Sequence, residues 1–313
     1  MFAYLDAAGN QVADRPTLER IKGLAIPPAW TSVWISPDPL GHIQATGVDS
    51  RGRLQYRYHP LWREQRDEQK FAHMLRFAAA LPGLRGATLR DVRHRRLDRG
   101  RVAATAVRLI DVGLFRIGGE RYAELDHHYG AATLEKQHVH VHRDGLEFDY
   151  TAKEGKHRTI TIVDPAVLST VRALERSGNG LTALFAFQDT ASAWHQLHSH
   201  DVSAYIADSS GGHFTAKEFR TWNATVLMAL ALAAAGPPAS ERAARTAVNA
   251  GVRSVAAWLG DTPTVARSAY IDPRLITRYT SGAGLAGIPE QAVALPAGPA
   301  VEEAVAALLA DTA

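Results

Sequence analysis

Four side chains, dispersed along the sequence, form a coherent set for breaking a phosphodiester bond. They are two arginines, a lysine and a tyrosine: Arg116, Arg220, Lys153 and Tyr270. A tyrosine oxygen can attack phosphorus and form a covalent phosphotyrosine, while two guanidinium groups neutralise the negative charge that builds up on the phosphate. A lysine can deliver a proton to the departing sugar oxygen. Because the bond energy is kept in the phosphotyrosine, this chemistry needs neither a metal nor ATP.

The lysine is predicted to lie at the tip between two strands. Residues 137–150 read as a hairpin, with Arg-Asp-Gly as its turn, and residues 158–163 read as a further strand. Lys153 lies in the connection, where a flexible side chain can approach a substrate. Lys156 lies on the same tip and is the alternative proton donor.

The two arginines and the tyrosine lie on or beside predicted helices. Arg116 lies near the end of a helix-compatible stretch, residues 93–121. Arg220 lies in the first turns of a long helix, which the capping-box pattern of residues 215–218 opens. Tyr270 follows a short predicted helix.

Each of these residues also has a purely structural interpretation. Arg116 could pair with Glu120, four residues further on. Arg220 could be a buried ion-pair arginine, and Tyr270 could be a packed aromatic side chain.

Three alternating histidines, His138, His140 and His142, raise the question of a metal site. One strand face without carboxylate or cysteine partners makes a weak site, so we expect these histidines to be paired or exposed to solvent. The sequence also has no nucleotide-binding glycine loop and no His-Glu-x-x-His pattern. We therefore predict no metal site and no cofactor.

Composition is that of a globular chain with one large domain or two of ordinary size. Of its 313 residues, 46% are hydrophobic and 21% are charged, which excludes global disorder. There is no cysteine, which excludes disulfides and thiolate catalysis. The longest apolar run, residues 224–236, is shorter than the ~20 residues of a membrane helix, and the chain does not open with a signal pattern. We expect a soluble cytoplasmic protein without a membrane partner.

Positive charge is concentrated in one segment. The formal net charge is only +3, from 35 basic and 32 acidic residues, but residues 81–110 carry eight arginines against two aspartates. Such a stripe suits the phosphate backbone of a nucleic acid. A solvated helix face is the alternative.

The first eighty residues read as a small β-rich unit, and the rest as mainly helical. Alternating, β-branched and aromatic runs predict strands at residues 30–36, 42–47 and 54–59. A helix follows, with an apolar face over residues 71–78. We expect it to stop at Pro82-Gly83, which we interpret as the linker between two domains.

Short motifs then occur in a recognisable order. They are LAIPPAW (24–30), GHIQATG (41–47), QYRYHP (55–60), RIGGERY (116–122), YGAATL (129–134), FTAKEFRT (214–221), LGDTP (259–263) and YIDP (270–273). Each motif alone is weak evidence. In this order over residues 20–280 the chain resembles the type IB DNA topoisomerases, in their poxvirus-like bacterial branch.

The resemblance implies an α+β fold with two domains that close around duplex DNA. These are a small β-rich N-terminal clamp domain, residues 1–82, and a larger, mainly α-helical catalytic domain with a β-hairpin excursion, residues 83–285. The second would have the catalytic fold that tyrosine recombinases share with topoisomerase IB. Residues 286–313 would be an Ala/Gly/Pro-rich tail with one short helix. We expect a monomer that is associated with the nucleoid and needs no protein partner.

The resemblance also implies roles for individual residues. Tyr270 would be the nucleophile, Arg116 and Arg220 would hold the scissile phosphate, and Lys153 would be the general acid. The implied DNA contacts are Gln55, Tyr56 and Tyr58 in the major groove, Tyr122 and Lys217 near the cleavage site, and Lys156. We place Tyr56 on the opposite strand face from Gln55 and Tyr58, so that not all three reach the groove equally, and strand packing is the alternative role.

Asp261 departs from the family pattern. Nine residues before the nucleophile, the family has a histidine or asparagine that donates a hydrogen bond to a phosphate oxygen, whereas an ionised aspartate only accepts. Asp261 could be protonated in the DNA complex. It could point away and cap the following helix, or the protein could be a poorly active relative. If Asp261 slows an active enzyme, Asp261→Asn is expected to raise the cleavage rate.

We therefore expect a type IB topoisomerase that nicks one strand, lets it rotate and reseals it. One alternative is a tyrosine recombinase-like strand transferase, although Lys217 stands where a recombinase has histidine. The other is a DNA-binding relative that Asp261 has left weakly active or inactive.

Overall fold

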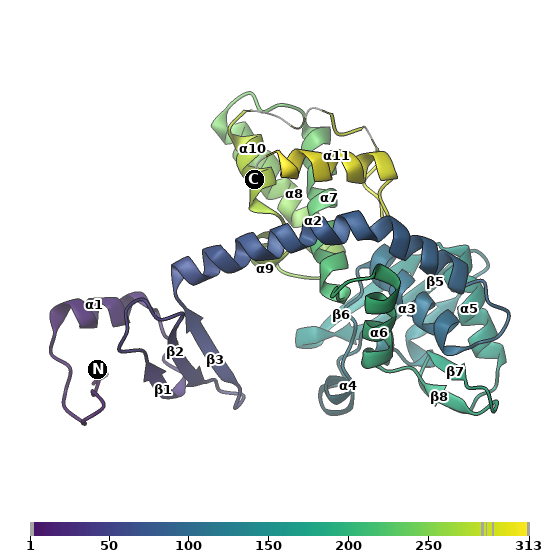
Figure 1. The fold of residues 1–313 in the computed structure, drawn as a ribbon, viewed down its shortest axis with the longest axis horizontal. Helices are drawn as coiled ribbons and strands as arrows, with labels where there is room; N and C mark the ends of the chain where they lie inside the picture. Colours follow the sequence, from purple (N-terminus) through teal and green to yellow (C-terminus); the bar gives the residue numbers. More distant parts are fainter. Residues whose placement is uncertain (1–2, 283–284, 286, 290, 312–313) are drawn as a thin grey trace. The chain divides into compact units, whose positions relative to one another are not determined.

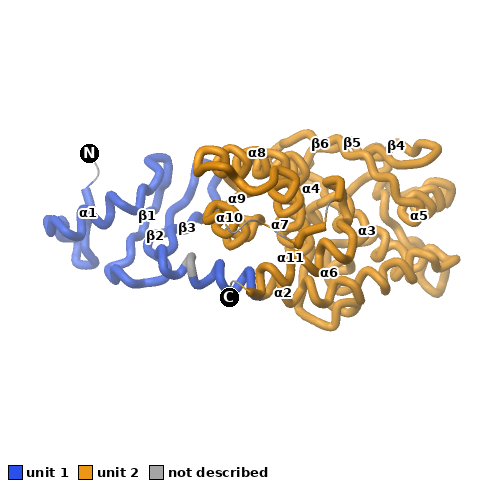
Figure 2. Tube along the Cα trace, turned by 90° about the horizontal axis from the view of Figure 1, so that it is seen from above, with its two compact units in different colours: residues 1–72 blue, residues 73–313 orange. Residues whose placement is uncertain are grey.

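The structure, a computed structural model, describes residues 3–282, 285, 287–289 and 291–311. It divides into two compact units, Met1–Ala72 and His73–Ala313, shown in blue and orange in Figure 2. The architecture is mixed and mainly helical with small sheets (Figure 1), which confirms the α+β class in its coarse form. Within the described ranges, no helix has both the length and the apolar character needed to span a membrane.

Unit 1 is built on a three-stranded antiparallel sheet. Helix α1 (Arg15–Gly23) precedes β1 (Thr31–Ile35), β2 (Ile43–Val48) and β3 (Leu54–Tyr58), which pair in that order. All three strands lie where the alternation of the sequence predicts them.

Two tyrosines share one face of β3. The rings of Tyr56 and Tyr58 are both exposed and stack with centroids 5.9 Å apart. Gln55 points the other way, where its amide donates to Asp49 at 2.9 Å. The prediction that Tyr56 faces away from Tyr58 is therefore wrong, because residues two apart on a strand share a face.

Helix α2 (Pro60–Asp91) contains Pro82 in its interior and continues through it. The predicted linker at Pro82-Gly83 is therefore wrong. A proline inside a helix removes one hydrogen bond and costs about 3 kcal/mol. Leu81 and Leu84 flank Pro82-Gly83 and are fully buried. The packing of their side chains outweighs the cost of the proline.

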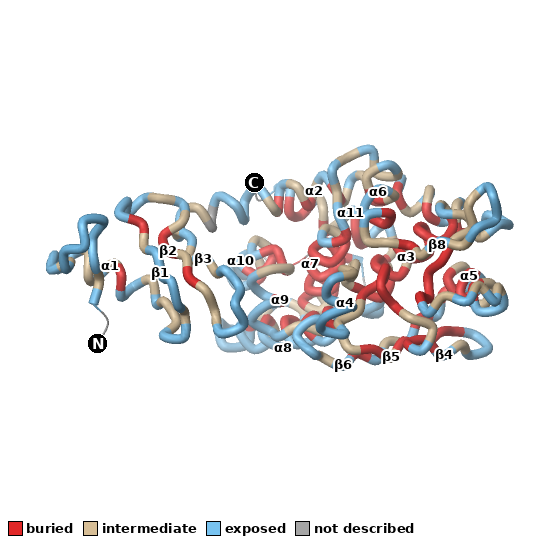
Figure 3. Tube along the Cα trace, turned by 90° about the horizontal axis from the view of Figure 1, so that it is seen from below, coloured by how far each residue is buried: buried red, intermediate tan, exposed pale blue. Residues whose placement is uncertain are grey.

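Helices dominate unit 2. After α2 they are α3 (Arg99–Gly113), α4 (Glu120–Asp126), α5 (Pro165–Arg176), α6 (Ser199–Ser210), α7 (Ala216–Ala235), α8 (Glu241–Leu259), α9 (Pro263–Ala269), α10 (Pro273–Thr280) and α11 (Pro299–Ala310). The buried residues concentrate on α3 and α7 (Figure 3), which are buried on nearly all sides, as expected of central helices.

Local signals fix where the two central helices begin. Asp98 caps α3 by accepting from the amide of Arg101 at 2.8 Å, so this helix is shorter than the predicted stretch 93–121. The predicted capping box of α7 is confirmed. Thr215 accepts from the amide of Lys217 at 3.2 Å, and Glu218 accepts from the amide of Thr215 at 2.7 Å.

Two small antiparallel sheets complete unit 2. Strands β4 (Val139–Val141), β5 (Leu146–Ala152) and β6 (Lys156–Ile162) pair in that order, which confirms the predicted hairpin and third strand. The hairpin of β7 (Ala186–Gln188) and β8 (Trp194–Gln196) was not predicted. Its strands have three residues each, too few to show an alternation.

The C-terminal helix α11 packs against α7 and lies beside α10 (Figure 1), so the predicted tail contains a docked element. Glu302 of α11 pairs with Arg85 of α2 at 2.7 Å. Arg85 also binds Asp111 at 2.8 Å, and Arg108 binds Asp164 at 2.9 Å. These two arginines of the basic stripe therefore stabilise the interior of unit 2, and the phosphate-backbone interpretation is wrong for them.

Candidate active site

Arg116 is positioned by a close crossing of two glycine-containing segments. It follows α3, and its carbonyl oxygen accepts from the amide of Ala131 at 2.8 Å. Gly118 has a left-handed φ of 86°, and a Cβ atom on Gly130 would lie 2.5 Å from the amide nitrogen of Gly118. Only glycine allows this approach, so the motifs RIGGERY and YGAATL together fix the backbone of Arg116.

Arg220 extends from the second turn of α7 and is 3% exposed. Its guanidinium donates to the carbonyl oxygens of Leu114, which ends α3, and of Leu259, which ends α8, the latter at 3.1 Å. Burial lowers the pKa of Arg220, and the positive charge of Arg116 acts in the same direction. Three helices, α3, α7 and α8, thus converge on this cation.

Tyr270 lies at the end of α9, half-buried, with its ring centroid 5.0 Å from the guanidinium carbon of Arg220. Its backbone is held by α7, the helix that also carries Arg220. The Thr225 hydroxyl oxygen accepts from the amide of Asp272 at 3.1 Å and lies 3.3 Å from the carbonyl oxygen of Tyr270. The tyrosine and the arginine are therefore fixed to the same rigid helix.

Asp261 bridges the two arginines. One carboxylate oxygen lies 2.7 Å from Nη2 of Arg116, and the other lies 2.8 Å from Nη2 of Arg220. The carboxylate is 7% exposed. Of the three interpretations of Asp261, the one in which it points away to cap α9 is wrong, because Thr262 caps that helix through the amide of Val265.

The structure thus brings four of the five predicted catalytic residues together: Arg116, Arg220, Asp261 and Tyr270. Lys153 lies in the short 3-10 turn Lys153–Gly155 between β5 and β6, as predicted, and is exposed. In the described part of the chain it has no hydrogen bond or ion pair. Lys156 instead lies 3.7 Å from Glu154.

Two residues of the site were not predicted from the sequence. Arg158 of β6 and Tyr150 of β5 are both buried, and they pair across the two strands. Burial raises the pKa of Tyr150, although the charges of Arg158, Arg220 and Arg116 oppose the rise. The alternation of the strand could have identified Arg158, because this arginine shares the inward-facing side with Ile160 and Ile162.

The cluster contains buried donors that no group among the described residues satisfies. Arg116 Nη1, Arg220 Nε and Arg158 Nη1 are buried and have no hydrogen-bond partner among the described residues. Unsatisfied buried donors are rare in folded proteins. Three such donors, one on each of three arginines, can bind an anion that has several oxygen atoms, such as a phosphate.

The predicted DNA-contacting residues of unit 2 lie at the surface. Tyr122 on α4 is 64% exposed, and Lys217 in the first turn of α7 is exposed one turn before Arg220. Gln55, Tyr56 and Tyr58 lie in unit 1, as described above. Their roles in DNA binding stay predictions.

The three alternating histidines do not line one strand face. His138 is buried in a 3-10 turn before β4, and its ring lies 4.2 Å from that of Tyr129. Burial lowers the pKa of His138, while His140 and His142 are exposed. Among the described residues, no group of three or more histidine and acidic side chains could hold a metal ion.

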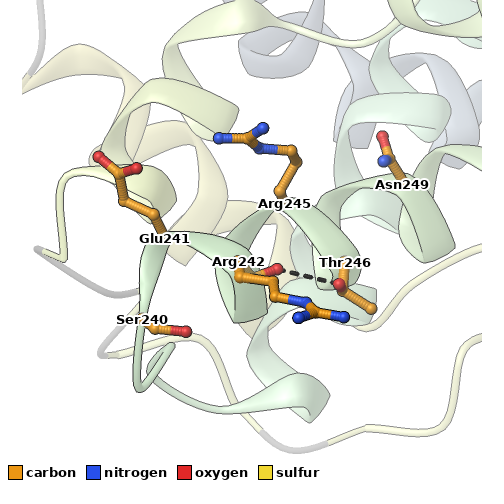
Figure 4. A pocket seen from close by; sticks show the side chains of 6 residues that line it. All are labelled: Ser240, Glu241, Arg242, Arg245, Thr246 and Asn249. Atoms are coloured by element: carbon orange, nitrogen blue, oxygen red, sulfur yellow. Dashed lines mark hydrogen bonds between the residues drawn. The ribbon is translucent and has the colours of Figure 1, made fainter.

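A hollow of about 500 Å³ lies elsewhere, over the N-terminal half of α8 (Figure 4). Charges of both signs line it, from Glu241, Arg242 and Arg245, together with Ser240, Thr246 and Asn249. It lies at the opposite end of α8 from Asp261, and none of the buried unpartnered donors is among its lining residues.

Comparisons with known proteins agree on one family. Residues 59–281 match the family described as the catalytic core of eukaryotic DNA topoisomerase I, and residues 1–49 match the N-terminal domain of bacterial DNA topoisomerase IB. The chain is also similar to DNA topoisomerase 1B of Acanthamoeba polyphaga mimivirus, with 28% identity over 275 residues. These cover 86% of this chain and 82% of that protein.

Proposed function

The chain belongs to the type IB DNA topoisomerase family, and from this premise we propose how its own residues act. It is a DNA topoisomerase, an isomerase that acts on DNA. We propose that it nicks one strand of a duplex through Tyr270, lets the free end rotate and reseals the strand. Supercoils of either sign then relax, driven by torsional energy, without ATP or a metal.

The proposed reaction exchanges one ester bond for another. The Tyr270 oxygen attacks phosphorus as the bond from phosphorus to the 5′-oxygen breaks, which leaves a 3′-phosphotyrosine. The phenol proton passes to solvent, and Lys153 supplies a proton to the departing 5′-oxygen. Resealing is the reverse, in which the 5′-hydroxyl attacks the phosphotyrosine and the tyrosine leaves.

The observation that carries this proposal is the cluster around Asp261. Arg116 and Arg220 point to a common centre beside the Tyr270 ring, and buried arginine donors around it lack partners. Arginine forks can stabilise the two negative charges of a pentacoordinate phosphorus. In the proposed reaction, the scissile phosphate binds the guanidinium groups that Asp261 bridges.

We further propose that unit 2 has the catalytic fold that type IB topoisomerases share with tyrosine recombinases. Its helical core and the lysine at the turn of a small sheet support this assignment. We propose a monomer that acts on the nucleoid in the cytoplasm. Affinity for DNA should rest mainly on phosphate contacts and fall steeply with salt.

Relaxation of a supercoiled plasmid, in EDTA and without ATP, tests the proposed reaction. Wild type is expected to yield a ladder of topoisomers. Tyr270→Phe is expected to yield none, because it lacks the attacking oxygen. Tyr205→Phe is the matched control, since its hydroxyl binds Asp91 and has no part in the proposed reaction.

The other outcomes separate the alternatives. A protein that shifts the plasmid on a gel but leaves the linking number unchanged is a DNA-binding relative, and Asp261 is then the first residue to replace. Joining of strands from two different duplexes indicates a recombinase-like transferase. Relaxation by Tyr270→Phe contradicts the assignment of the nucleophile.

A further inference from the structure

Arg158 is a buried cation outside the set of proposed catalytic residues. It extends from β6 and is 8% exposed. Its Nη2 donates to the carbonyl oxygen of Trp258 at 2.9 Å, and its Nη1 is buried without a hydrogen-bond partner in the ranges that the structure describes. No carboxylate in the described part of the chain forms an ion pair with it. A buried charge that lacks a counter-ion is strongly destabilising unless nearby groups offset it.

The groups around Arg158 are those of the candidate active site. Burial lowers the pKa of Arg158, and the positive charges of Arg220 and Arg116 act in the same direction. The Tyr150 hydroxyl and the Asp261 carboxylate oppose this effect. The sheet register agrees with this, since Tyr150 of β5 lies opposite Arg158 of β6.

Arg158 also lies against the turn that carries Asp261. Gly260 ends α8 in the left-handed conformation, with a φ of 64°. A Cβ atom there would lie 2.7 Å from Nε of Arg158. Arg158 thus packs on the residue before Asp261 and, through Trp258, is bonded to the same turn.

The charges of the cluster show why a third arginine matters. Arg116 and Arg220 carry two positive charges, and Asp261 removes one of them. The transition state of phosphoryl transfer at a diester carries two negative charges on the phosphate. Arg158 restores the positive excess to two, which balances those charges at a buried site where electrostatic interactions are strong.

We infer that Arg158 is a positioning residue of the proposed phosphate site, which offsets the charge of Asp261 and fixes the turn that carries it. The inference rests on the proposed function. It has a consequence that a purely structural arginine does not share. The need for Arg158 depends on the negative charge of Asp261, so the two residues are energetically coupled.

A double-mutant cycle tests this coupling. The measurement is the single-turnover rate of covalent adduct formation with a suicide DNA substrate. Arg158→Gln is expected to slow the rate by at least about 10-fold in wild type, but by less than about threefold in an Asp261→Asn background. Arg158→Lys keeps the charge and is expected to retain most of the wild-type rate. Arg172→Gln is the matched control, because Arg172, which lies on α5, also donates to backbone carbonyl oxygens, those of His142 and Arg143.

If Arg158→Gln slows adduct formation equally in wild type and in Asp261→Asn, the inference is overturned and Arg158 only anchors the turn. An unchanged rate for Arg158→Gln in wild type would overturn it as well. Melting temperatures identify variants that fail to fold. If Arg158→Gln fails to fold, a folded Arg158→Lys that forms no adduct overturns the inference. Failure of the proposed function is distinct, since wild type would then form no adduct, or Tyr270→Phe would form one.

Discussion

At the scale of single residues, Asp261 would make the proposed binding of phosphate an exchange of anions. Both of its oxygens hold guanidinium nitrogens that the proposed reaction assigns to the phosphate. A phosphate that enters must displace this carboxylate or share the arginines with it, and like charges in a buried site repel each other. The carboxylate therefore stabilises the site without DNA and opposes the bound state.

Replacing Asp261 with asparagine is expected to speed cleavage. Asparagine removes the negative charge and adds an amide that can donate to a phosphate oxygen. One oriented donor is worth about 10²–10³ in rate at comparable sites, so we expect a gain of about 10-fold or more at neutral pH. Single-turnover adduct formation measures it.

The matched control is Asp144→Asn, in the exposed turn of the β4–β5 hairpin. It makes the same change of charge away from the cluster, and its rate should equal that of wild type. No gain, or a loss, for Asp261→Asn would show that the carboxylate does not oppose catalysis.

Residue type and motif order identified the candidate residues, but not their partners. Asp261 stood out as a departure from a family pattern. Its orientation toward both arginines depends on the turn at Gly260 and on the packing of α7 against α8, which are tertiary features. Arg158 was missed because its partners are a distant carbonyl oxygen and a facing strand, neither of which leaves a local pattern.

At the scale of elements, the crossing at Gly118 and Gly130 is expected to tolerate no side chain. The nearest atoms to a Cβ on Gly130 are backbone atoms, which cannot rotate away. Gly130→Ala should therefore destabilise the protein by about 2 kcal/mol or more. It should also slow adduct formation, because the crossing fixes Arg116. Chemical denaturation measures the first effect and the suicide substrate the second.

Gly83→Ala in α2 is the opposite case. A Cβ there meets no atom within 4 Å, and the residue is helical. Alanine is preferred to glycine inside a helix by up to about 1 kcal/mol, so this variant should be more stable than wild type and equally active. If Gly83→Ala is less stable than wild type, or Gly130→Ala is as stable, the space around each glycine does not determine whether alanine is tolerated there.

Elements with strong local signals were predicted, and those fixed by tertiary contacts were not. The strands of unit 1 and the capping box of α7 follow from alternation and hydrogen-bonding side chains. Helix α2 passes through a proline and a glycine because buried leucines hold both halves. The β7–β8 hairpin is too short for periodicity, and its backbone pairing is what defines it.

At the scale of the whole molecule, one tyrosine is expected to shape stability at alkaline pH. The Tyr205 hydroxyl of α6 donates to Asp91, at the end of α2, at 2.7 Å. Burial, followed by this carboxylate, raises the pKa of Tyr205 to about 12 from an ordinary 10.0. The folded state thus disfavours the phenolate. The stability that the protonated Tyr205 hydroxyl gives the folded state is fully present below pH 10. It is lost as the pH rises from 10 toward 12.

Melting temperatures between pH 7 and 12 test this expectation. Wild type should lose stability more steeply above pH 10 than Tyr205→Phe, which has no ionisable hydroxyl. At pH 7 the variant should be less stable by about 1 kcal/mol, because it lacks the hydrogen bond. Tyr122→Phe is the control for an exposed tyrosine. Parallel curves for wild type and Tyr205→Phe would contradict the assignment.

The attachment of Tyr270 to α7 through Thr225 bears on the safety of the genome. During the proposed reaction the 3′ end of the broken strand is joined to the protein by its ester to this tyrosine. Because α7 carries both that anchor and Arg220, the captured end stays where resealing can occur while the other end turns. Genetic information on the two sides of the nick is therefore rejoined in its original order, and a break that could be lethal is kept as a brief, reversible state.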